Sequence, residues 1–171
     1  MDHLLWLDME MTGLNVEVEV PIELAAMVTN KKLEILDSYH AVINQPQKFL
    51  DGMDSWNKEH HGKSGLLELI ASGKSPSVVE VDLLQLLDKY WANEKVVLAG
   101  NSIGQDRLFI NKHFQRFAER LHYRMLDVTA FKLVFNNFYG RVFTKNNSHR
   151  AIDDIHESIK ELSFYLSFIE R

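Results

Sequence analysis

Apolar and polar positions follow a strand-like pattern early in this chain and a helical pattern afterwards. Residues 3–9 form a short apolar run that predicts a buried strand. Residues 22–30 and 33–43 predict two further strands joined by a tight turn at Asn30-Lys31-Lys32, and the polar stretch 71–76 predicts a loop. Apolar side chains then recur every three or four positions, which predicts a helix. Its expected buried face comprises Val78, Val81, Leu84, Leu87 and Trp91.

The second half of the chain alternates between the two patterns. Strands are expected at Lys95–Ala99 and Tyr123–Leu126. Helices are expected from about Ile103 to Arg120, at about 128–138 and at 150–169. Strands first, then helices alternating with strands, predict an α/β fold with a mixed sheet flanked by helices.

Composition narrows the class of protein. The 171 residues, 46% hydrophobic and 11% aromatic, are typical of a globular chain, and we expect residues 1–171 to form one domain. The absence of cysteine excludes disulfides and thiolate metal sites. No apolar window is long enough to span a membrane and no basic leader begins the chain, so a cytoplasmic location is the default expectation. A net charge of −5 disfavours an extended basic face for nucleic acid but leaves room for a small basic site.

Two acids lie two residues apart where the first apolar run ends. Side chains alternate faces along a strand, so Asp8 and Glu10 point to the same side, together with Leu4 and Trp6. Carboxylates crowded in this way repel one another unless cations neutralise them. The alternative is a strand that simply runs into an acidic loop.

A third acid, Asp106, lies on the apolar stripe of the helix expected at 103–120. That stripe comprises Ile103, Ile110, Phe114, Phe117 and Leu121. An acid on an inward face needs a cation or strong hydrogen-bond donors to offset its desolvation. The alternative is an acid at a helix start, where the helix dipole favours it.

The last helix distinguishes two adjacent aspartates. Its apolar face comprises Ala151, Ile152, Ile155, Ile159, Leu162, Leu166 and Ile169. At ~100° per residue, Asp154 lies about 100° from the centre of that face and Asp153 about 160° away, so Asp154 can reach an inward site. His149 lies just before the helix; it is either a solvated loop residue or a general base that titrates near neutrality.

The set Asp8, Glu10, Asp106, His149 and Asp154 resembles the DEDDh exonucleases, the DnaQ-like 3′→5′ exonucleases on an RNase H-like fold. Within them, several segments resemble the oligoribonuclease family. They are Leu7-Asp-Met-Glu-Met-Thr-Gly-Leu14, Asp54-Ser-Trp-Asn57, His61-Gly-Lys-Ser-Gly65, Gly100-Asn-Ser-Ile-Gly-Gln-Asp-Arg107, His122-Tyr-Arg-Met-Leu-Asp-Val128 and Ser148-His-Arg-Ala-Ile-Asp-Asp-Ile-His-Glu-Ser158. They span nearly the whole chain in the family's order; the stretch 136–147 looks shortened.

This resemblance implies a five-stranded sheet and a hydrolase that removes nucleotides from the 3′ end of very short RNAs, dinucleotides above all, as 5′-mononucleotides. It implies that Asp8, Glu10, Asp106 and Asp154 hold two Mg²⁺ or Mn²⁺ ions ~3.5–4 Å apart. His149 would take the proton of the attacking water. Relatives of this family also act inside organelles.

The resemblance also implies the substrate contacts. Leu14 matches a wedge against the two bases and Trp56 an aromatic that stacks on one, although both could be ordinary core residues. Arg124 and Thr129 match residues that close over the 5′-phosphate, while Ser102 and Gln105 match other substrate contacts. Tyr123 matches a tyrosine delivered by a second subunit, which implies a homodimer.

Two residues and two rival functions stay open. Arg107 is a candidate phosphate contact or salt-bridge partner, and Glu23 either supports the metal ligands or is a strand-edge residue. A general single-strand exonuclease that trims RNA or proofreads DNA would share the acid cluster. A silent binding module could share the fold, although all five candidate catalytic positions are present.

Overall fold

A five-stranded mixed sheet forms the centre of the computed structural model, which describes residues 2–144 and 150–169. The strands are β1 His3–Met11, β2 Pro21–Asn30, β3 Ile35–Val42, β4 Val96–Gly100 and β5 Leu121–Asp127. Their order across the sheet is β3-β2-β1-β4-β5. β1, β2 and β3 pair antiparallel, whereas β4 and β5 run parallel to β1. The expected mixed five-stranded sheet is confirmed.

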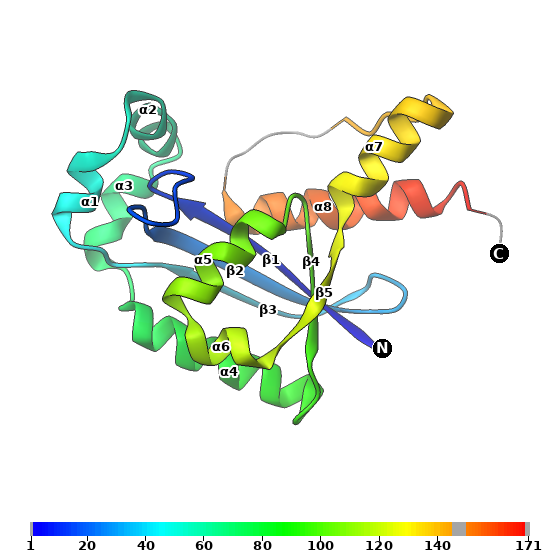
Figure 1. Ribbon diagram of the computed structural model, residues 1–171, viewed down its shortest axis with the longest axis horizontal. Helices are drawn as coiled ribbons and strands as arrows, with labels where there is room; N and C mark the ends of the chain where they lie inside the picture. The colour runs from blue at the N-terminus through cyan, green and yellow to red at the C-terminus, as the bar shows by residue number, and fades with distance from the viewer. Residues whose placement is uncertain (1, 145–149, 170–171) are drawn as a thin grey trace.

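Helices cover both faces of this sheet (Figure 1). The helices are α1 Gln47–Gly52, α2 Ser55–Lys63, α3 Leu66–Leu69, the 3₁₀ turn η1 Ile70–Ser72, α4 Pro76–Trp91, α5 Gly104–His113, α6 Gln115–Arg120, α7 Val128–Tyr139 and α8 Ala151–Leu166. Leu5 and Leu7 of β1 pack with α4, α5 and α6, while Leu4 and Trp6 pack with α7 and α8. Within the described part of the chain, every helix is too short or too polar to span a lipid bilayer.

The buried face of α4 differs from the expected one. Its buried residues are Val79, Leu83, Leu86, Leu87 and Trp91. Val78 is 46% exposed and Val81 39% exposed, so these two residues were wrongly assigned to the core. Two neighbouring apolar stripes on this helix both satisfy the helical period. Periodicity alone therefore identifies the helix but not which stripe packs on the sheet.

The single helix expected at 103–120 is divided into α5 and α6. Phe114 adopts a non-helical backbone with φ −134° and ψ 62°, and its side chain is fully buried. The N–H groups at the start of α6 find an acceptor on another helix, because Glu80 of α4 accepts hydrogen bonds from Arg116 N (2.8 Å) and Phe117 N (3.3 Å). This tertiary cap compensates for the helical bonds lost at the break.

The short helices α1 to α3 occupy a stretch for which the apolar pattern predicted no element. α2 is polar almost throughout, so it has no hydrophobic stripe to reveal it. Its start does carry a local signal: Asp54 accepts a hydrogen bond from Asn57 N at 2.7 Å, the usual role of an N-cap aspartate.

At the other end of the chain, α8 stops at Leu166. Ile169, which was expected on the buried face of this helix, is 48% exposed.

Candidate active site

The carboxylates of Asp8, Glu10 and Asp154 meet between β1 and α8. One carboxylate oxygen from each residue lies within 4.8 Å of the others. Asp8 and Glu10 share the face of β1 that α8 covers, and Asp154 lies in the first turn of α8. Asp154 is half-buried and Asp153 exposed, as the helical geometry predicted.

Asp106 contacts the same strand from α5. Its Oδ1 accepts a hydrogen bond of 3.0 Å from the backbone N–H of Met9, the residue between Asp8 and Glu10. β4 pairs with β1 at Leu5 and Trp6. Asp106 therefore supplies a hydrogen-bond acceptor to the part of β1 that extends beyond this pairing. Asp106 is only 6% exposed, which confirms its place on the buried stripe. The structure thus groups three predicted acids tightly and fixes the fourth to the backbone between two of them.

The electrostatics of this cluster suit a cation. Burial, and then the negative charges of Asp154, Glu23 and Asp106, raise the pKa of Glu10 to about 8. Burial also raises the pKa of Asp106, against the hydrogen bond donated by Met9. Such shifts arise where carboxylates are buried close to one another with little compensating positive charge. Oxygen ligands of this kind fit a hard divalent ion such as Mg²⁺ or Mn²⁺.

Glu23 connects the sheet to the start of α8. It is fully buried on β2, opposite Glu10, and its Oε1 accepts hydrogen bonds from Arg150 Nε (2.9 Å) and Nη2 (2.7 Å). His40 Nε2 lies 2.7 Å from the same oxygen, and Ala151 N donates to Oε2 at 3.3 Å. Burial opposes ionisation of Glu23, but these hydrogen bonds outweigh it and keep its pKa below the usual range. Glu23 therefore supports the helix that carries Asp154 and is no strand-edge residue.

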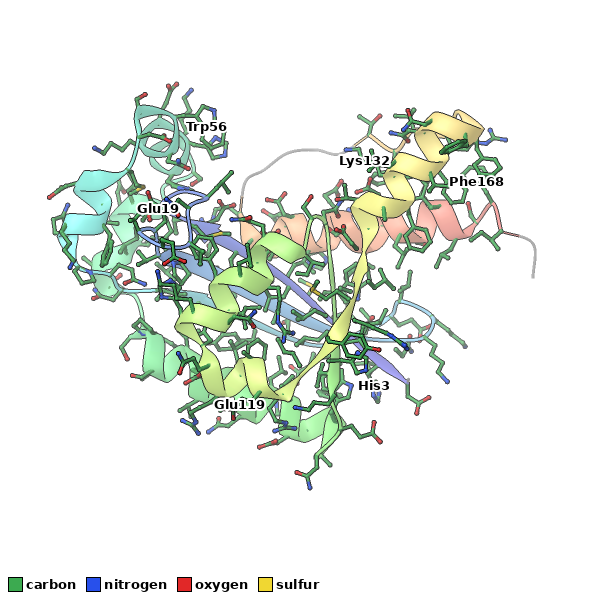
Figure 2. The ribbon with its side chains drawn as sticks, viewed as in Figure 1. His3, Glu19, Trp56, Glu119, Lys132 and Phe168 are labelled. Atoms are coloured by element: carbon green, nitrogen blue, oxygen red, sulfur yellow. The ribbon has the colours of Figure 1, made fainter. Side chains whose placement is uncertain are left out.

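The predicted base contacts are exposed rather than part of the core. Leu14 is 76% exposed, in the loop after β1, and its carbonyl oxygen accepts a hydrogen bond of 2.7 Å from Gln105 Nε2. Trp56 is 64% exposed and stacks on His60 with ring centroids 4.5 Å apart. Figure 2 shows Trp56 on the flank of α2 nearer to α7. The alternative that these two side chains belong to the core is wrong.

Ser102 and Thr129 form a pair of neighbouring hydroxyls at the end of β4. Their Oγ atoms lie 3.1 Å apart. Ser102 N donates to both Thr129 Oγ1 and Asp127 Oδ1, each at 2.9 Å. Ser102 has a φ of 50°, in the left-handed region that residues with a Cβ rarely adopt. Asp127, which sequence reasoning did not single out, thus fixes this turn and also caps α7 through Thr129 N.

Tyr123 and Arg124 lie together on the edge strand β5. Tyr123 is 74% exposed, and the Arg124 guanidinium lies 5.2 Å from the centre of its ring. Arg124 therefore lies beside Tyr123, whereas Thr129, the other residue matched to the 5′-phosphate, contacts Ser102.

Arg107 donates to the carbonyl oxygens of His122 and Ala118 and to the side chain of Asn111. In the described part of the chain its guanidinium thus joins α5 to neighbouring backbone, and a phosphate contact stays a prediction.

One histidine beside the cluster was not identified by sequence reasoning. His61 of α2 is buried, its Nε2 lies 2.9 Å from the Met11 carbonyl oxygen and its Nδ1 lies 3.9 Å from Glu10 Oε2. The basic, polar pattern of α2 gives no sign of this burial. His149, the predicted general base, lies outside the described residues.

Comparison with known proteins defines the class. The RNase T family model, described as an exonuclease, matches residues 5–162. A crystal structure of the zinc-bound complex of E. coli ExoI with single-stranded DNA superimposes with a TM-score of 0.78 at 13% identity. That likeness covers 98% of this chain and 41% of the other, so the chain spans about two fifths of its length. The shared architecture is the RNase H-like exonuclease fold, and the chain is a nuclease of this class.

Relatives of similar length give the particular family. The chain is 43% identical to the oligoribonuclease of Coxiella burnetii, over 96% of this chain and 92% of the relative. It is 40% identical to the mitochondrial oligoribonuclease of Mus musculus, over 95% of this chain and 71% of the relative. The chain therefore belongs to the oligoribonuclease family of DEDDh exonucleases.

Proposed function

We propose that this protein is a metal-dependent 3′→5′ exoribonuclease that hydrolyses very short RNAs, especially dinucleotides, to 5′-mononucleotides. The observation that carries the proposal is the group of three carboxylates, drawn from β1 and α8, with oxygens within 4.8 Å of one another. The oligoribonuclease relatives support the substrate class. We take residues 1–171 as a single exonuclease domain.

The acidic residues have a defined part in this proposal. Asp8, Glu10, Asp106 and Asp154 would hold two divalent ions, Mg²⁺ or Mn²⁺. When bound, such ions supply the positive charge that activates water and stabilises the leaving oxygen in phosphodiester hydrolysis. Glu23 and Arg150 hold the start of α8 so that Asp154 faces β1. His149 would accept the proton of the attacking water.

The exposed side chains around the cluster would bind the RNA. Trp56 offers a ring face for stacking a base, a contact worth roughly 1–3 kcal/mol, and Leu14 offers an apolar edge. The hydroxyls of Ser102 and Thr129 can donate to a phosphate or a sugar, and Gln105 holds the loop that carries Leu14. Arg124 would supply the positive charge for a 5′-phosphate.

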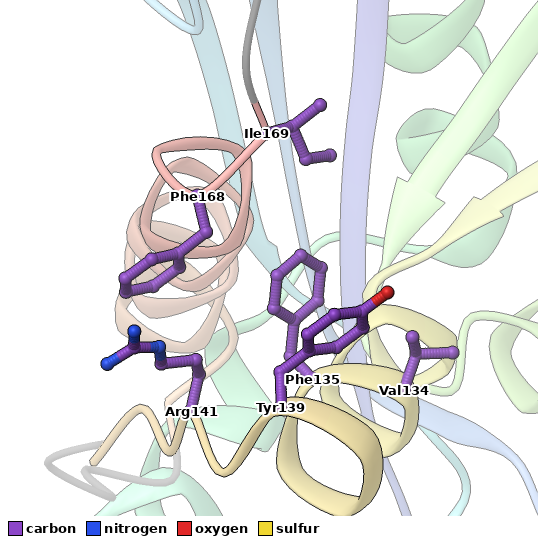
Figure 3. Close-up of a pocket in the computed structure, with 6 residues that line it drawn as sticks. All are labelled: Val134, Phe135, Tyr139, Arg141, Phe168 and Ile169. Carbon is purple, nitrogen blue, oxygen red and sulfur yellow. The ribbon is translucent and has the colours of Figure 1, made fainter.

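A second copy of the chain is the proposed partner. Tyr123 projects from an edge strand and is 74% exposed, so it is available to another molecule. The end of α7 and the residues after α8 also expose apolar surface, with Phe138 80%, Tyr139 65% and Ile169 48% exposed. A hollow of about 530 Å³ lies there. Figure 3 shows the described residues that line it, which are Val134, Phe135, Tyr139, Arg141, Phe168 and Ile169. Among these described residues Arg141 alone is charged, so the hollow suits an apolar contact and not the hydrolysis.

Polarity of cleavage and metal dependence test the proposal together. A 5′-labelled RNA trinucleotide incubated with Mn²⁺ should shorten one nucleotide at a time from its 3′ end, and EDTA should stop the reaction. A matched single-stranded DNA belongs in the same assay, because the similar ExoI structure contains single-stranded DNA. Release of the labelled 5′ nucleotide first, or cleavage that continues in EDTA, would contradict the proposal. Faster cleavage of the DNA would favour a general exonuclease.

A further inference from the structure

A line of buried polar residues runs along α8, beside its apolar face. Asp154, Ser158, Glu161 and Tyr165 follow one another at intervals of four, three and four residues, so they share one side of the helix. Ser158 is 4% exposed, and Glu161 and Tyr165 are fully buried. This line begins at the acid cluster and leads away from it. Asp154 has a place in the proposed chemistry, whereas Glu161 does not yet have one.

Glu161 receives hydrogen bonds from two different parts of the fold. Asn101 Nδ2 donates to Oε2 at 2.9 Å, and the Tyr165 hydroxyl donates to Oε1 at 3.1 Å. A buried carboxylate stabilises a fold no better than a well-packed apolar residue would, because its desolvation offsets its hydrogen bonds. What the carboxylate does provide is direction, since two oxygens determine where both donors lie.

Of the two donors to Glu161, Asn101 is the one next to the proposed RNA contacts, because it begins the turn between β4 and α5. The next residue, Ser102, has the strained φ of 50° and presents its hydroxyl to Thr129. Gln105 follows and holds the loop of Leu14. This turn is attached on one side by Asp127 and Thr129, which accept from Ser102 N. Glu161 attaches it on the other side, through the Asn101 side chain.

We propose that Glu161 is a positioning residue for substrate binding, which it serves by fixing the Asn101 side chain and hence the turn of Ser102 and Gln105. This role rests on the proposed function, in which Ser102 and Gln105 contribute to RNA binding. Glu161 lies two helical turns from Asp154 and contacts a different segment, so it orients the RNA rather than the metal ligands. Loss of Glu161 should therefore weaken RNA binding and leave metal binding unchanged.

Two variants of Glu161 and a matched control separate positioning from general destabilisation. Glu161→Ala removes both acceptors. Glu161→Gln keeps an acceptor for Tyr165, and its amide can donate to Asn101 Oδ1, a buried atom with no hydrogen-bond partner among the described residues. Leu162→Ala is the control, because Leu162 is 2% exposed on the same helix but packs in the apolar cluster with Trp6 and Ile159.

The measurement is kcat and KM for a 5′-phosphorylated RNA dinucleotide with Mn²⁺, together with Mn²⁺ affinity determined by calorimetry without RNA. Glu161→Ala should raise KM at least fivefold, with kcat and Mn²⁺ affinity within twofold of the wild type. Glu161→Gln should restore KM to within twofold, and Leu162→Ala should lower thermal stability without changing KM. In the double variant Asn101→Ala/Glu161→Ala, KM should be no higher than in the worse single variant, because both changes remove the same hydrogen bond between Asn101 and Glu161.

The outcomes distinguish the positioning role from the function itself. An unchanged KM in Glu161→Ala, an equal rise in Leu162→Ala or a change in Mn²⁺ affinity would overturn the positioning role alone. Should Glu161→Ala fail to fold, Asn101→Ala tests the same contact from the other side, and an unchanged KM there overturns the role equally. Absence of dinucleotide cleavage by the wild type would instead overturn the proposed function, and this role with it.

Discussion

Two adjacent aspartates on α8 have different surroundings although their chemistry is identical. Asp154 faces β1 and groups with Asp8 and Glu10, whereas Asp153 is exposed to solvent. The difference follows from the ~100° turn per residue of an α-helix, which carries one side chain towards the sheet and the next away from it. At the scale of single residues, position on a helix therefore decides which acid can serve as a metal ligand.

This pair provides a matched test of the acid cluster. Asp154→Asn should lower kcat/KM on short RNA by about a hundredfold or more, because it removes an anionic oxygen from the metal site. Asp153→Asn, with the same change of charge one residue away, should stay within twofold of the wild type. Steady-state kinetics with Mn²⁺ measure both. Equal losses in the two variants would show that net charge, and not the cluster, matters.

Glu10 makes the stability of the metal-free protein depend on pH. Its pKa is raised to about 8 in the folded state, mainly by burial, so the folded protein holds a proton that the unfolded chain releases near its ordinary pKa of 4.5. The folded state therefore binds more protons between these values, and stability falls as pH rises through that window. At about 1.4 kcal/mol for each pH unit between 4.5 and about 8, the loss across the whole window should be on the order of 5 kcal/mol in the free energy of unfolding.

Urea unfolding in EDTA at pH 5.5 and pH 8.5 measures this dependence. Glu10→Gln should flatten it, because the glutamine does not titrate. Addition of Mn²⁺ at pH 7 should release protons, which calorimetry in buffers of different ionisation enthalpy detects. A wild type that becomes more stable as pH rises, or an unchanged slope in Glu10→Gln, would contradict the assigned crowding.

At the scale of elements, α8 depends on a cap supplied from the sheet. The N-cap residue Arg150 makes no capping hydrogen bond with its own side chain. Glu23 of β2 accepts from Ala151 N instead and also binds the Arg150 guanidinium. The helix that carries Asp154 is thus anchored to the strand that lies opposite Glu10.

Removing this anchor should destabilise the fold. Glu23→Gln should lower the free energy of unfolding by roughly 2–4 kcal/mol, because it leaves a partly buried Arg150 without its anionic partner. The exposed i,i+4 pair of Glu59 and Lys63 is the control, and Glu59→Gln should cause no measurable change. Thermal and urea unfolding give the comparison. Equal effects in the two variants would remove the special role of Glu23.

The elements also show what could be predicted from the chain. The strands and the helices α4, α7 and α8 were predictable because apolar runs and apolar periodicity reveal the type of an element, although not which face is buried. The wrong face of α4, the break at Phe114 and the missed α2 have a common cause. Each depends on a partner distant in sequence, such as Glu80 for the start of α6. Glu161 was hidden for a similar reason, because buried acids are recognised only once their donors are known.

At the scale of the whole molecule, the strand order brings the distant acids together. β1 lies at the centre of the sheet, between β2 and β4. Two helices therefore reach the end of β1: α5, which follows β4, and α8, the last helix. Asp106 of α5 binds the β1 backbone, and Asp154 of α8 joins Asp8 and Glu10. The resemblance to a known family suggested that these four acids share one site. The pattern of residues within any single segment does not show it.

The exposed apolar end of α7 leads to a prediction for the assembly. Wild type should elute as a dimer in size-exclusion chromatography with light scattering, and Phe138→Glu should shift it towards the monomer, because Phe138 is 80% exposed. Val81→Glu, on α4 across the sheet, should leave the dimer unchanged. A monomeric wild type, or a dimer that tolerates both changes, would contradict the proposed interface.

The most direct test of the proposed function is the dependence of cleavage on RNA length. Wild-type protein should be assayed with Mn²⁺ on 5′-phosphorylated RNAs of two, three and seven nucleotides, and kcat/KM compared. The account predicts the highest value for the dinucleotide and a value at least tenfold lower for the heptanucleotide. Equal or faster hydrolysis of the heptanucleotide would contradict the assignment to very short RNA.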